Sequence, residues 1–405
     1  WVEFTNDSLQ LRTANVQSPF TPRTALLADK DQTLFAHYNF TFSGSVVNGY
    51  LAGSKVFLDF NLNGFLDEGE PFGFSTTSGG YELEVSEEDM RLHDRNGDGS
   101  INHTEAMLVV QGGMDRSSSL PLSIAFRAPP SYSVITAVST IVAEIVESGK
   151  TLDDAETLVA QYLSLPNDID LSSFEPLSSA FLQKEKARDF VRRSTQLANL
   201  MNAGARFIET STEMQTGIMR GSELIVSALK SHLLEQAAVN PNSGNQVFDF
   251  SDSASLRSIV VQADGDAKKE NNLSESGTQR RSDTAQNETE TIDNSPLLDL
   301  LVQQIVSANG ALDDLAQNGD VEATGFKALA SASQNILDQI GVEAVLSVSE
   351  DGNANGITSG ANEFSLNSLQ DFSSQSQINV YAPLHSGTKL SSPTALNDNM
   401  VVGGF

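Results

Sequence analysis

The hydrophobic pattern of this chain changes its period at Pro129 and Pro130, and this change constrains the fold more than any other feature. Upstream of it, short runs alternate apolar with polar residues, which is typical of strands with one buried face. The apolar members are Leu34, Ala36, Tyr38, Phe40 and Phe42; Val56 and Leu58; Tyr81, Leu83 and Val85; and Leu120, Leu122, Ile124 and Phe126. Because Gly, Asn and Asp separate the runs, residues 34–130 are predicted to form an antiparallel β-sandwich.

Downstream of Pro130 the apolar residues follow a helical period. Val134, Val138, Ile141, Val142, Ile145 and Val146 form one stripe, and Gly149 follows as a C-terminal cap. Thr151 with Asp154 then starts a second helix that Pro166 ends. Similar patterns over 184–207, 222–235, 296–308 and 323–340 predict an all-α helical bundle over residues 131–345. The expected fold class is therefore α+β multidomain.

Three segments are expected to lie outside these two domains. Residues 1–33 are an N-terminal extension, and Trp1 at the start suggests a processed or excised piece of a longer chain. Residues 264–295 are almost free of apolar side chains, so they are predicted to form a mobile surface loop within the bundle. Residues 346–405 are rich in Ser, Asn and Gly and form a C-terminal tail that could start another β module.

The charge of the chain restricts its partners. With 24 Lys and Arg against 53 Asp and Glu, the net charge is −29, which repels phosphate backbones and anionic lipid headgroups. We therefore expect no nucleic acid among the partners and cations as the natural ligands. No apolar stretch reaches the 18 residues of a membrane span, so no membrane insertion is expected.

The chain has no cysteine and only five histidines. The missing cysteines exclude disulfides, thiol catalysis and iron–sulfur clusters. The histidines lack the H-x₃-H or H-E-x-x-H spacing of a zinc site, so any metal is expected to be a hard one.

The segment Asp94–Glu105 matches the twelve-residue calcium loop at every diagnostic position. Gly99 permits the sharp turn at position 6, and Ile101 is expected to anchor the loop to a core. Oxygen ligands of this kind converge on a large hard cation. The expected metal ligands are Asp94, Asn96, Asp98, the Ser100 carbonyl, Asn102 and Glu105.

A second copy of the pattern lies upstream at Asp59–Glu70. Gly64 occupies the turn and Leu66 the apolar position, whereas a strand leads in and Pro71 leads out, unlike in a helix–loop–helix hand. The expected ligands are Asp59, Asn61, Asn63, the Phe65 carbonyl, Asp67 and Glu70. The offset from Asp59 to Asp94 is 94 − 59 = 35 residues, and the paired helices of a sensor are missing, which favours structural Ca²⁺ over a switch.

The residues around the loop Asp59–Glu70 resemble a known family. Gly44–Gly53, Val56–Asp59 and Asp67–Pro71, with Gly79–Leu83 as a G-x-Y-x-L strand, are similar to SdrD B-like and related transthyretin-like repeats of large bacterial or algal surface adhesins. The resemblance covers about 90 residues and implies a calcium-bearing β-sandwich that acts as a spacer. One departure is the insertion that holds Asp94–Glu105. Residues 136–171 resemble the helical segment that follows such modules, and Ser392–Asn399 resemble the opening of cadherin-like repeats.

The resulting expectation is a secreted, non-enzymatic, calcium-stabilised structural or adhesive segment of a large cell-surface protein. Other copies of the chain, or neighbouring domains of a larger protein, are the further expected partners. One alternative is a subunit of an assembled extracellular filament or appendage. The other is a carbohydrate-active module, which the 7% of aromatic residues and the single Trp disfavour because sugars stack on aromatic rings.

Overall fold

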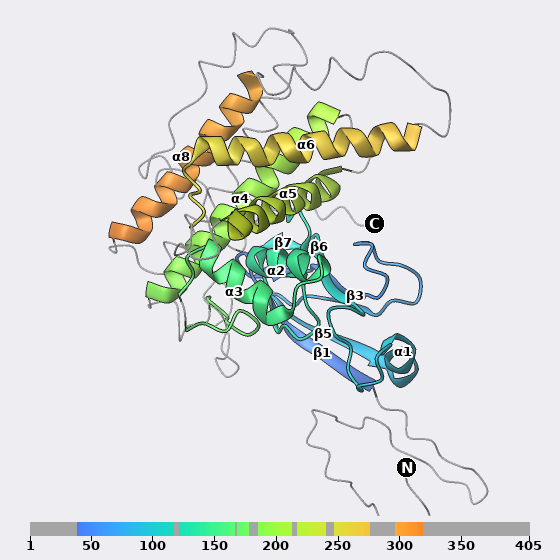
Figure 1. Ribbon diagram of the computed structural model, residues 1–405. Coiled ribbons are helices and arrows are strands. Elements are labelled where there is room, and N and C mark those ends of the chain that lie inside the picture. Colours follow the sequence, from blue (N-terminus) through green and yellow to red (C-terminus); the bar gives the residue numbers. More distant parts are fainter. Residues whose placement is uncertain are drawn as a thin grey trace, which may run out of the picture.

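The computed structural model describes residues 39–116, 121–166, 168–177, 185–212, 217–239, 247–275 and 296–318. These residues form strands and helices in an α+β arrangement, which confirms the predicted mixture of both (Figure 1). The predicted extension 1–33 and tail 346–405, and the predicted helix 323–340, lie outside the described residues.

The strands lie in the first hundred described residues and form three sheets. A four-stranded antiparallel sheet has the order β4–β3–β6–β8, a three-stranded sheet has the order β5–β1–β9, and β2 pairs with β7. The pairing of β1 with β9 is parallel, whereas every other described strand pair is antiparallel. The strands are β1 (Asn39–Val46), β2 (Leu51–Ala52), β3 (Lys55–Asp59), β4 (Phe72–Phe74), β5 (Gly80–Ser86), β6 (Met107–Gln111), β7 (Met114–Asp115), β8 (Phe126–Ala128) and β9 (Val134–Ile135).

Strand β5 illustrates why these segments become strands. Tyr81, Leu83 and Val85 are buried and Glu82 and Glu84 are exposed, which is the period of two expected from the sequence. The same strand approaches β4 closely at Gly73, where an added Cβ would lie 2.8 Å from the Glu82 carbonyl oxygen. Glycine at this position therefore allows the two sheets to come together.

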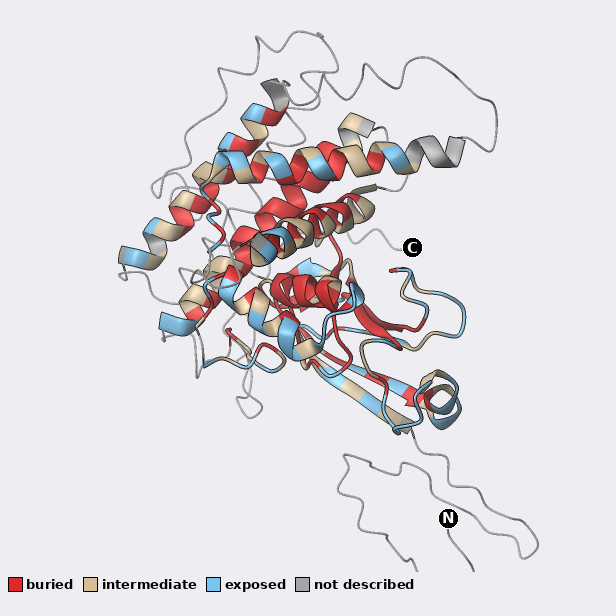
Figure 2. Cartoon of the chain, in the orientation of Figure 1, coloured by how far each residue is buried: buried red, intermediate tan, exposed pale blue. Residues whose placement is uncertain are grey.

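Helices make up the remainder of the described chain. They are α1 (Glu87–His93), α2 (Ala137–Glu147), α3 (Leu152–Tyr162), α4 (Glu185–Thr212), α5 (Gly217–Val239), α6 (Ser253–Glu275) and α8 (Pro296–Asn318). Helix α2 lies between the strands and the long helices and is buried along most of its length (Figures 1 and 2). Among the described residues, no helix combines the length and the apolar character needed to cross a membrane.

The N-terminal end of α2 shows how buried polar residues are satisfied. The Thr136 side chain accepts a hydrogen bond from Ser139 N, and Ser139 Oγ in turn accepts one from Thr136 N, which is a reciprocal cap. The predicted helical stripe from Val134 is wrong in its first turn, because Val134 and Ile135 form β9. The Thr136 cap ends the strand and starts the helix.

One apolar cluster runs through strands and helices alike. It extends from Val46 and Val56 on the strands, through Val138 and Ile141 on α2, to the long helices. The boundary predicted near residue 130 is thus crossed by continuous packing, as the buried residues in Figure 2 indicate.

The predicted surface loop 264–295 is wrong in its first part, because α6 continues to Glu275. Ala263, Asp264 and Ala267 are buried, so small residues form the contact face of this part of the helix in place of large apolar side chains. The Asp264 carboxylate accepts a hydrogen bond from Ser211 and lies 3.3 Å from Lys268 Nζ. Residues 276–295 lie outside the described part of the chain.

Candidate metal centres

The first loop, Asp59–Glu70, connects β3 to the strand β4. Asp59 is the last residue of β3 and pairs with Met107 of β6, so the sheet fixes where the loop begins. Asp59 is fully buried. The Gln111 side-chain amide donates a 2.9 Å hydrogen bond to the Gly64 carbonyl, which attaches the far side of the loop to β6.

Backbone N–H groups hold the side-chain oxygens of the first loop. The two Asp59 oxygens accept from Asn63 N and Gly64 N at 3.3 and 2.7 Å. The two Glu70 oxygens accept from Phe60 N and Asp67 N, both at 2.9 Å. The loop is therefore closed from its first to its twelfth residue by carboxylates.

The second loop, Asp94–Glu105, connects α1 to β6. Ser86 caps α1 by accepting from Asp89 N at 3.0 Å, and α1 ends at the residue before Asp94. Ile101 is buried in the main apolar cluster, which confirms its role as an anchor, whereas Leu66 of the first loop is half-buried.

The second loop repeats the closure of the first. The Asp94 carboxylate accepts from Gly97 N and Gly99 N at 2.7 and 2.8 Å. Glu105, only 1% exposed, accepts from Arg95 N at 2.7 Å and from Asn102 N at 3.0 Å. These donors occupy positions 2 and 9, as Phe60 and Asp67 do in the first loop.

The correspondence extends to the middle of both loops. At position 3, Asn61 and Asn96 accept from the N–H two residues on, at 3.1 and 2.8 Å. At position 5, Asn63 and Asp98 do the same at 2.7 and 2.9 Å. The backbone is left-handed at position 6 in both, with φ of 80° at Gly64 and 85° at Gly99. Two segments of different sequence thus adopt one loop conformation.

The donor chemistry of each loop suits a hard divalent cation. Each expected ligand set holds three carboxylates, further side-chain oxygens and a backbone carbonyl, with no sulfur or imidazole. Among the described residues, however, no three Asp, Glu or His side chains form a group that could hold a metal ion. The Asn61 and Asn63 amides both donate to Asp67 Oδ2 at 2.7 Å, and the Asn96 amide donates to Asp98 at 2.9 Å. These carboxylates are thus engaged by amide groups of their own loops.

Two carboxylates of the loops differ in their electrostatics. Hydrogen bonds from the side chains of Ser100 and Asn96 lower the pKa of Asp98, which favours its charged form. Burial raises the pKa of Glu70, with Asp59 and Asp67 acting in the same direction. A nearby cation would relieve this repulsion within the first loop.

The two loops touch each other, which the sequence did not reveal. The Phe60 ring stacks on the His93 imidazole, and the Arg95 guanidinium donates a 3.2 Å hydrogen bond to the Phe60 carbonyl. Phe60 and Arg95 both occupy position 2. The ligand sets that lie 35 residues apart in the chain therefore belong to one region of the molecule.

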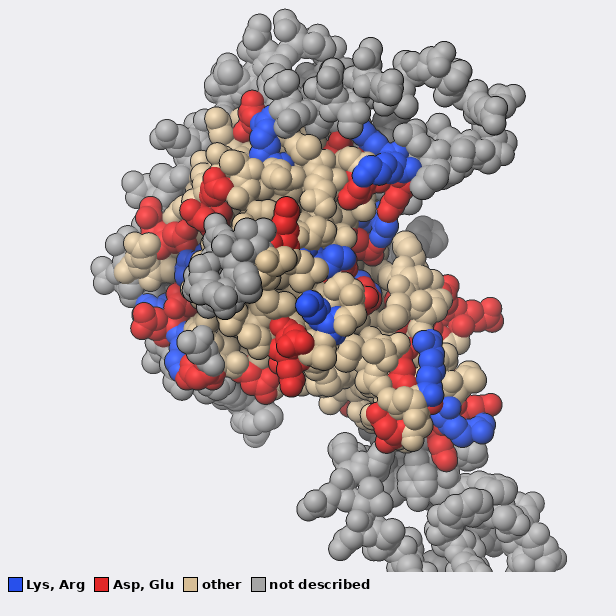
Figure 3. Space-filling model, viewed as in Figure 1, with Lys and Arg blue, Asp and Glu red and all other residues tan. Residues whose placement is uncertain are grey.

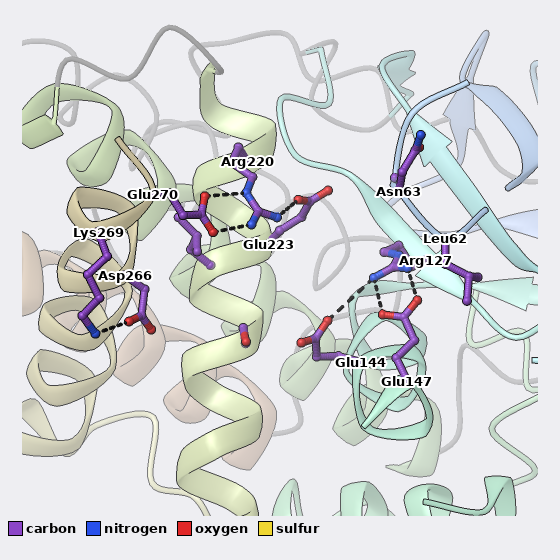
Figure 4. Close-up of a pocket in the computed structure, with 13 residues that line it drawn as sticks. Leu62, Asn63, Arg127, Glu144, Glu147, Arg220, Glu223, Asp266, Lys269 and Glu270 are labelled. Carbon is purple, nitrogen blue, oxygen red and sulfur yellow. Dashed lines mark hydrogen bonds and ion pairs between the residues drawn. The ribbon is translucent and has the colours of Figure 1, made fainter. Parts of the chain in front are cut away.

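The first loop and the helices line a common cavity. Figure 4 shows Leu62 and Asn63 on one side of it and the charged residues of α2, α5 and α6 around it. These residues form ion pairs: Arg127 of β8 with Glu147 of α2, and Arg220 of α5 with Glu223 of the same helix and Glu270 of α6, at 2.6 Å each. Figure 3 shows acidic and basic side chains interspersed in the same way over the visible face.

Comparison of the chain with protein-family models, with curated proteins and with solved structures gave no significant match to any of them.

Proposed function

We propose that this chain is an extracellular, calcium-stabilised structural or adhesive segment of a larger cell-surface protein, and that it has no enzymatic role. The observation that carries the proposal is the equivalence of the two loops. Asp59 and Asp94, Glu70 and Glu105 accept hydrogen bonds from backbone groups at the same loop positions. Ca²⁺ is the proposed ligand of both loops because it accepts six to eight oxygens in flexible geometry.

The residues of each loop have separate roles in this proposal. Asp59, Asn61, Asn63, the Phe65 carbonyl, Asp67 and Glu70 hold the first ion, and Asp94, Asn96, Asp98, the Ser100 carbonyl, Asn102 and Glu105 the second. One bound Ca²⁺ supplies two positive charges, which offset two of the three ligand carboxylates in each loop. The chain itself supplies the N–H groups that hold those carboxylates in place.

The stabilisation follows from mass action. Extracellular calcium modules bind with dissociation constants of about 10⁻⁴ to 10⁻³ M, so millimolar calcium fills them. An ion in tenfold excess over its dissociation constant adds about 1.4 kcal/mol to the free energy of unfolding. The second loop leads into β6, and Asp59 of the first loop pairs with Met107 of β6, so this stabilisation applies to the centre of the four-stranded sheet.

The finer architecture belongs to the same proposal. We infer that the sheets of residues 34–130 face each other as a sandwich and that the helices of residues 131–345 form a bundle. The close approach of Gly73 to Glu82 supports the facing sheets. The similarity to SdrD B-like repeats supports the cell-surface location.

Scanning calorimetry of the whole chain tests the proposal. In millimolar calcium the first unfolding transition should lie several degrees higher than in EGTA, and calorimetric titration should give two binding sites. Magnesium at the same concentration should produce a smaller shift, because Mg²⁺ demands a tighter octahedral site. Identical melting in calcium and EGTA would refute the proposed role.

A second candidate is a subunit of an assembled filament or appendage, and strand β4 favours it. Phe72 and Phe74 are 54% and 59% exposed, and their rings contact each other edge to face at 6.1 Å. They lie on an edge strand of the four-stranded sheet. Exposed apolar edge strands pair with other chains. Sedimentation of the wild-type chain and of F72S/F74S distinguishes the two candidates. If the chain assembles through β4, the wild type should sediment as an oligomer and the variant as a smaller species.

A further inference from the structure

The two loops share one conformation but have different surroundings. Gly64 of the first loop is buried, and an added Cβ there would lie 2.8 Å from Glu223 Oε1 of α5. The equivalent Gly99 is exposed, and its added Cβ would meet no atom of the described residues within 4 Å, chain neighbours excluded. The first loop therefore packs against a helix and the second does not.

The fourth residue of each loop also differs between the packed first loop and the exposed second loop. Both loops are left-handed there, with φ of 61° at Leu62 and 73° at Gly97. Leucine in this conformation costs roughly 1–2 kcal/mol, whereas glycine adopts it without strain. Leu62 packs against the main apolar cluster, so contact with the rest of the fold offsets the strain.

The surface that faces the loop apex, defined as Leu62–Gly64, is cross-linked. Arg220 joins Glu223 on α5 to Glu270 on α6, with both distances 2.6 Å. On the other side, Lys230 of α5 contacts Glu144 of α2 at 2.7 Å. The apex thus adjoins a set of helices that are already tied to one another (Figure 4).

We propose that the first loop is a docking element between the β-sheet and α5, and that its occupancy by Ca²⁺, unlike that of the second loop, stabilises α5. This inference rests on the proposed calcium binding. The expected ligands Asn61 and Asn63 flank Leu62, and Asn63 directly precedes Gly64. An ion that fixes those ligands must also fix Leu62 and Gly64 against the helix.

Hydrogen exchange of the whole chain, read in peptides of α5, tests the docking role. At calcium tenfold above the dissociation constant, α5 amides should exchange about tenfold more slowly than in EGTA. Leu62→Gly places in the first loop the residue that the second loop has at position 4. In this variant calorimetry should still count two ions, whereas the calcium-dependent slowing in α5 should disappear.

Glu105→Gln is the matched control, because it disables only the second loop. It should bind one ion and keep the slowing in α5. If Leu62→Gly fails to fold, Leu62→Asn replaces it, since Asn tolerates left-handed backbone. Two outcomes would overturn the docking role alone. In one, the wild type binds two ions but its α5 amides exchange equally fast in calcium and in EGTA; in the other, Leu62→Gly shows the same calcium-dependent slowing in α5 as the wild type. The absence of calcium binding to the wild type would overturn the proposed function with it.

Discussion

Phe60 and His93 stack face to face, with ring centroids 3.6 Å apart and planes inclined by 4°. Phe60 is the second residue of the first loop, and His93 precedes the second loop directly. The stack and the Arg95 hydrogen bond to Phe60 are direct contacts between the two loop regions. The two loop regions are therefore joined by two direct contacts in addition to the strand β6 on which both depend.

A double-mutant cycle should detect this contact. Phe60→Leu keeps most of the apolar volume, and His93→Ala removes the partner ring. We expect the two changes to couple by about 0.5–1.5 kcal/mol, which is typical of aromatic pairs. Urea unfolding in EGTA measures the cycle without a contribution from calcium. Additive effects of the two substitutions would show that the stacked rings contribute nothing beyond their separate packing.

Replacing the carboxylate at the twelfth position of either loop should abolish calcium binding by that loop only. Glu70→Gln and Glu105→Gln each replace a carboxylate by an amide, so each variant should bind one calcium ion fewer. In calcium tenfold above the dissociation constant, each should lose about 1.4 kcal/mol of stability that the wild type gains from the ion. Calorimetric titration and urea unfolding measure the two quantities.

Glu68→Gln is the control for this experiment. Glu68 is exposed, lies at position 10 of the first loop and is not an expected ligand. Its replacement removes the same charge, so it should keep both ions. Equal loss of binding in Glu68→Gln and Glu70→Gln would mean that calcium responds to the net charge of the loop and not to its twelfth residue.

The conformation of the two loops could be predicted from the sequence because their information is local. Gly64 and Gly99, two acidic residues at the first and twelfth positions and amides between them specify the turn within twelve residues. The alternation in β5 is local in the same sense. These local patterns could not predict which other part of the fold each loop packs against. The burial of Gly64 under Glu223 depends on residues 159 positions apart (223 − 64), whose contact no local period encodes.

The continuation of α6 into the predicted loop 264–295 has a related cause. Hydrophobic periodicity recognises large apolar side chains, whereas Ala263 and Ala267 bury little surface and Asp264 is buried through its partners. Parallel pairing of β1 with β9 was equally hidden. Val134 and Ile135 fit a helical stripe and a strand alike, and only Ser45 and Val46 across the sheet decide between them.

Breaking the ion pair of Arg127 should destabilise the region where the helices meet the sheet. Arg127 is 8% exposed, and its guanidinium donates to both Glu147 oxygens. Arg127→Met leaves Glu147 without its partner. A fully buried pair loses about 3–5 kcal/mol in this way. We expect about 2 kcal/mol here, because the Glu147 side chain keeps 22% exposure. Urea unfolding gives the loss, and Arg127→Met/Glu147→Met should recover most of it. A double variant as unstable as the single one would locate the effect in packing and not in charge.

The contact between Tyr162 and His232 should make stability depend on pH. The Tyr162 hydroxyl lies 2.7 Å from His232 Nδ1, and the Phe248 ring packs against both. Burial lowers the pKa of His232, although Glu235 and Asp252 act in the opposite direction. Since the unfolded chain has a histidine pKa of about 6.5, it binds a proton before the folded chain does as the pH falls. The contribution of His232 to stability is therefore complete above about pH 6.5 and decreases below it.

Urea unfolding between pH 8 and 5 in EGTA measures this dependence. The wild type should lose stability more steeply below about pH 6.5 than His232→Gln, which keeps a polar side chain but cannot titrate in this range. The acidic residues shared by both proteins contribute equally, so the difference between the two slopes isolates His232. Parallel curves would show that the imidazole has the same proton affinity in the folded and unfolded chain. A steeper loss in His232→Gln would show that the folded structure binds the imidazolium in preference to the neutral ring.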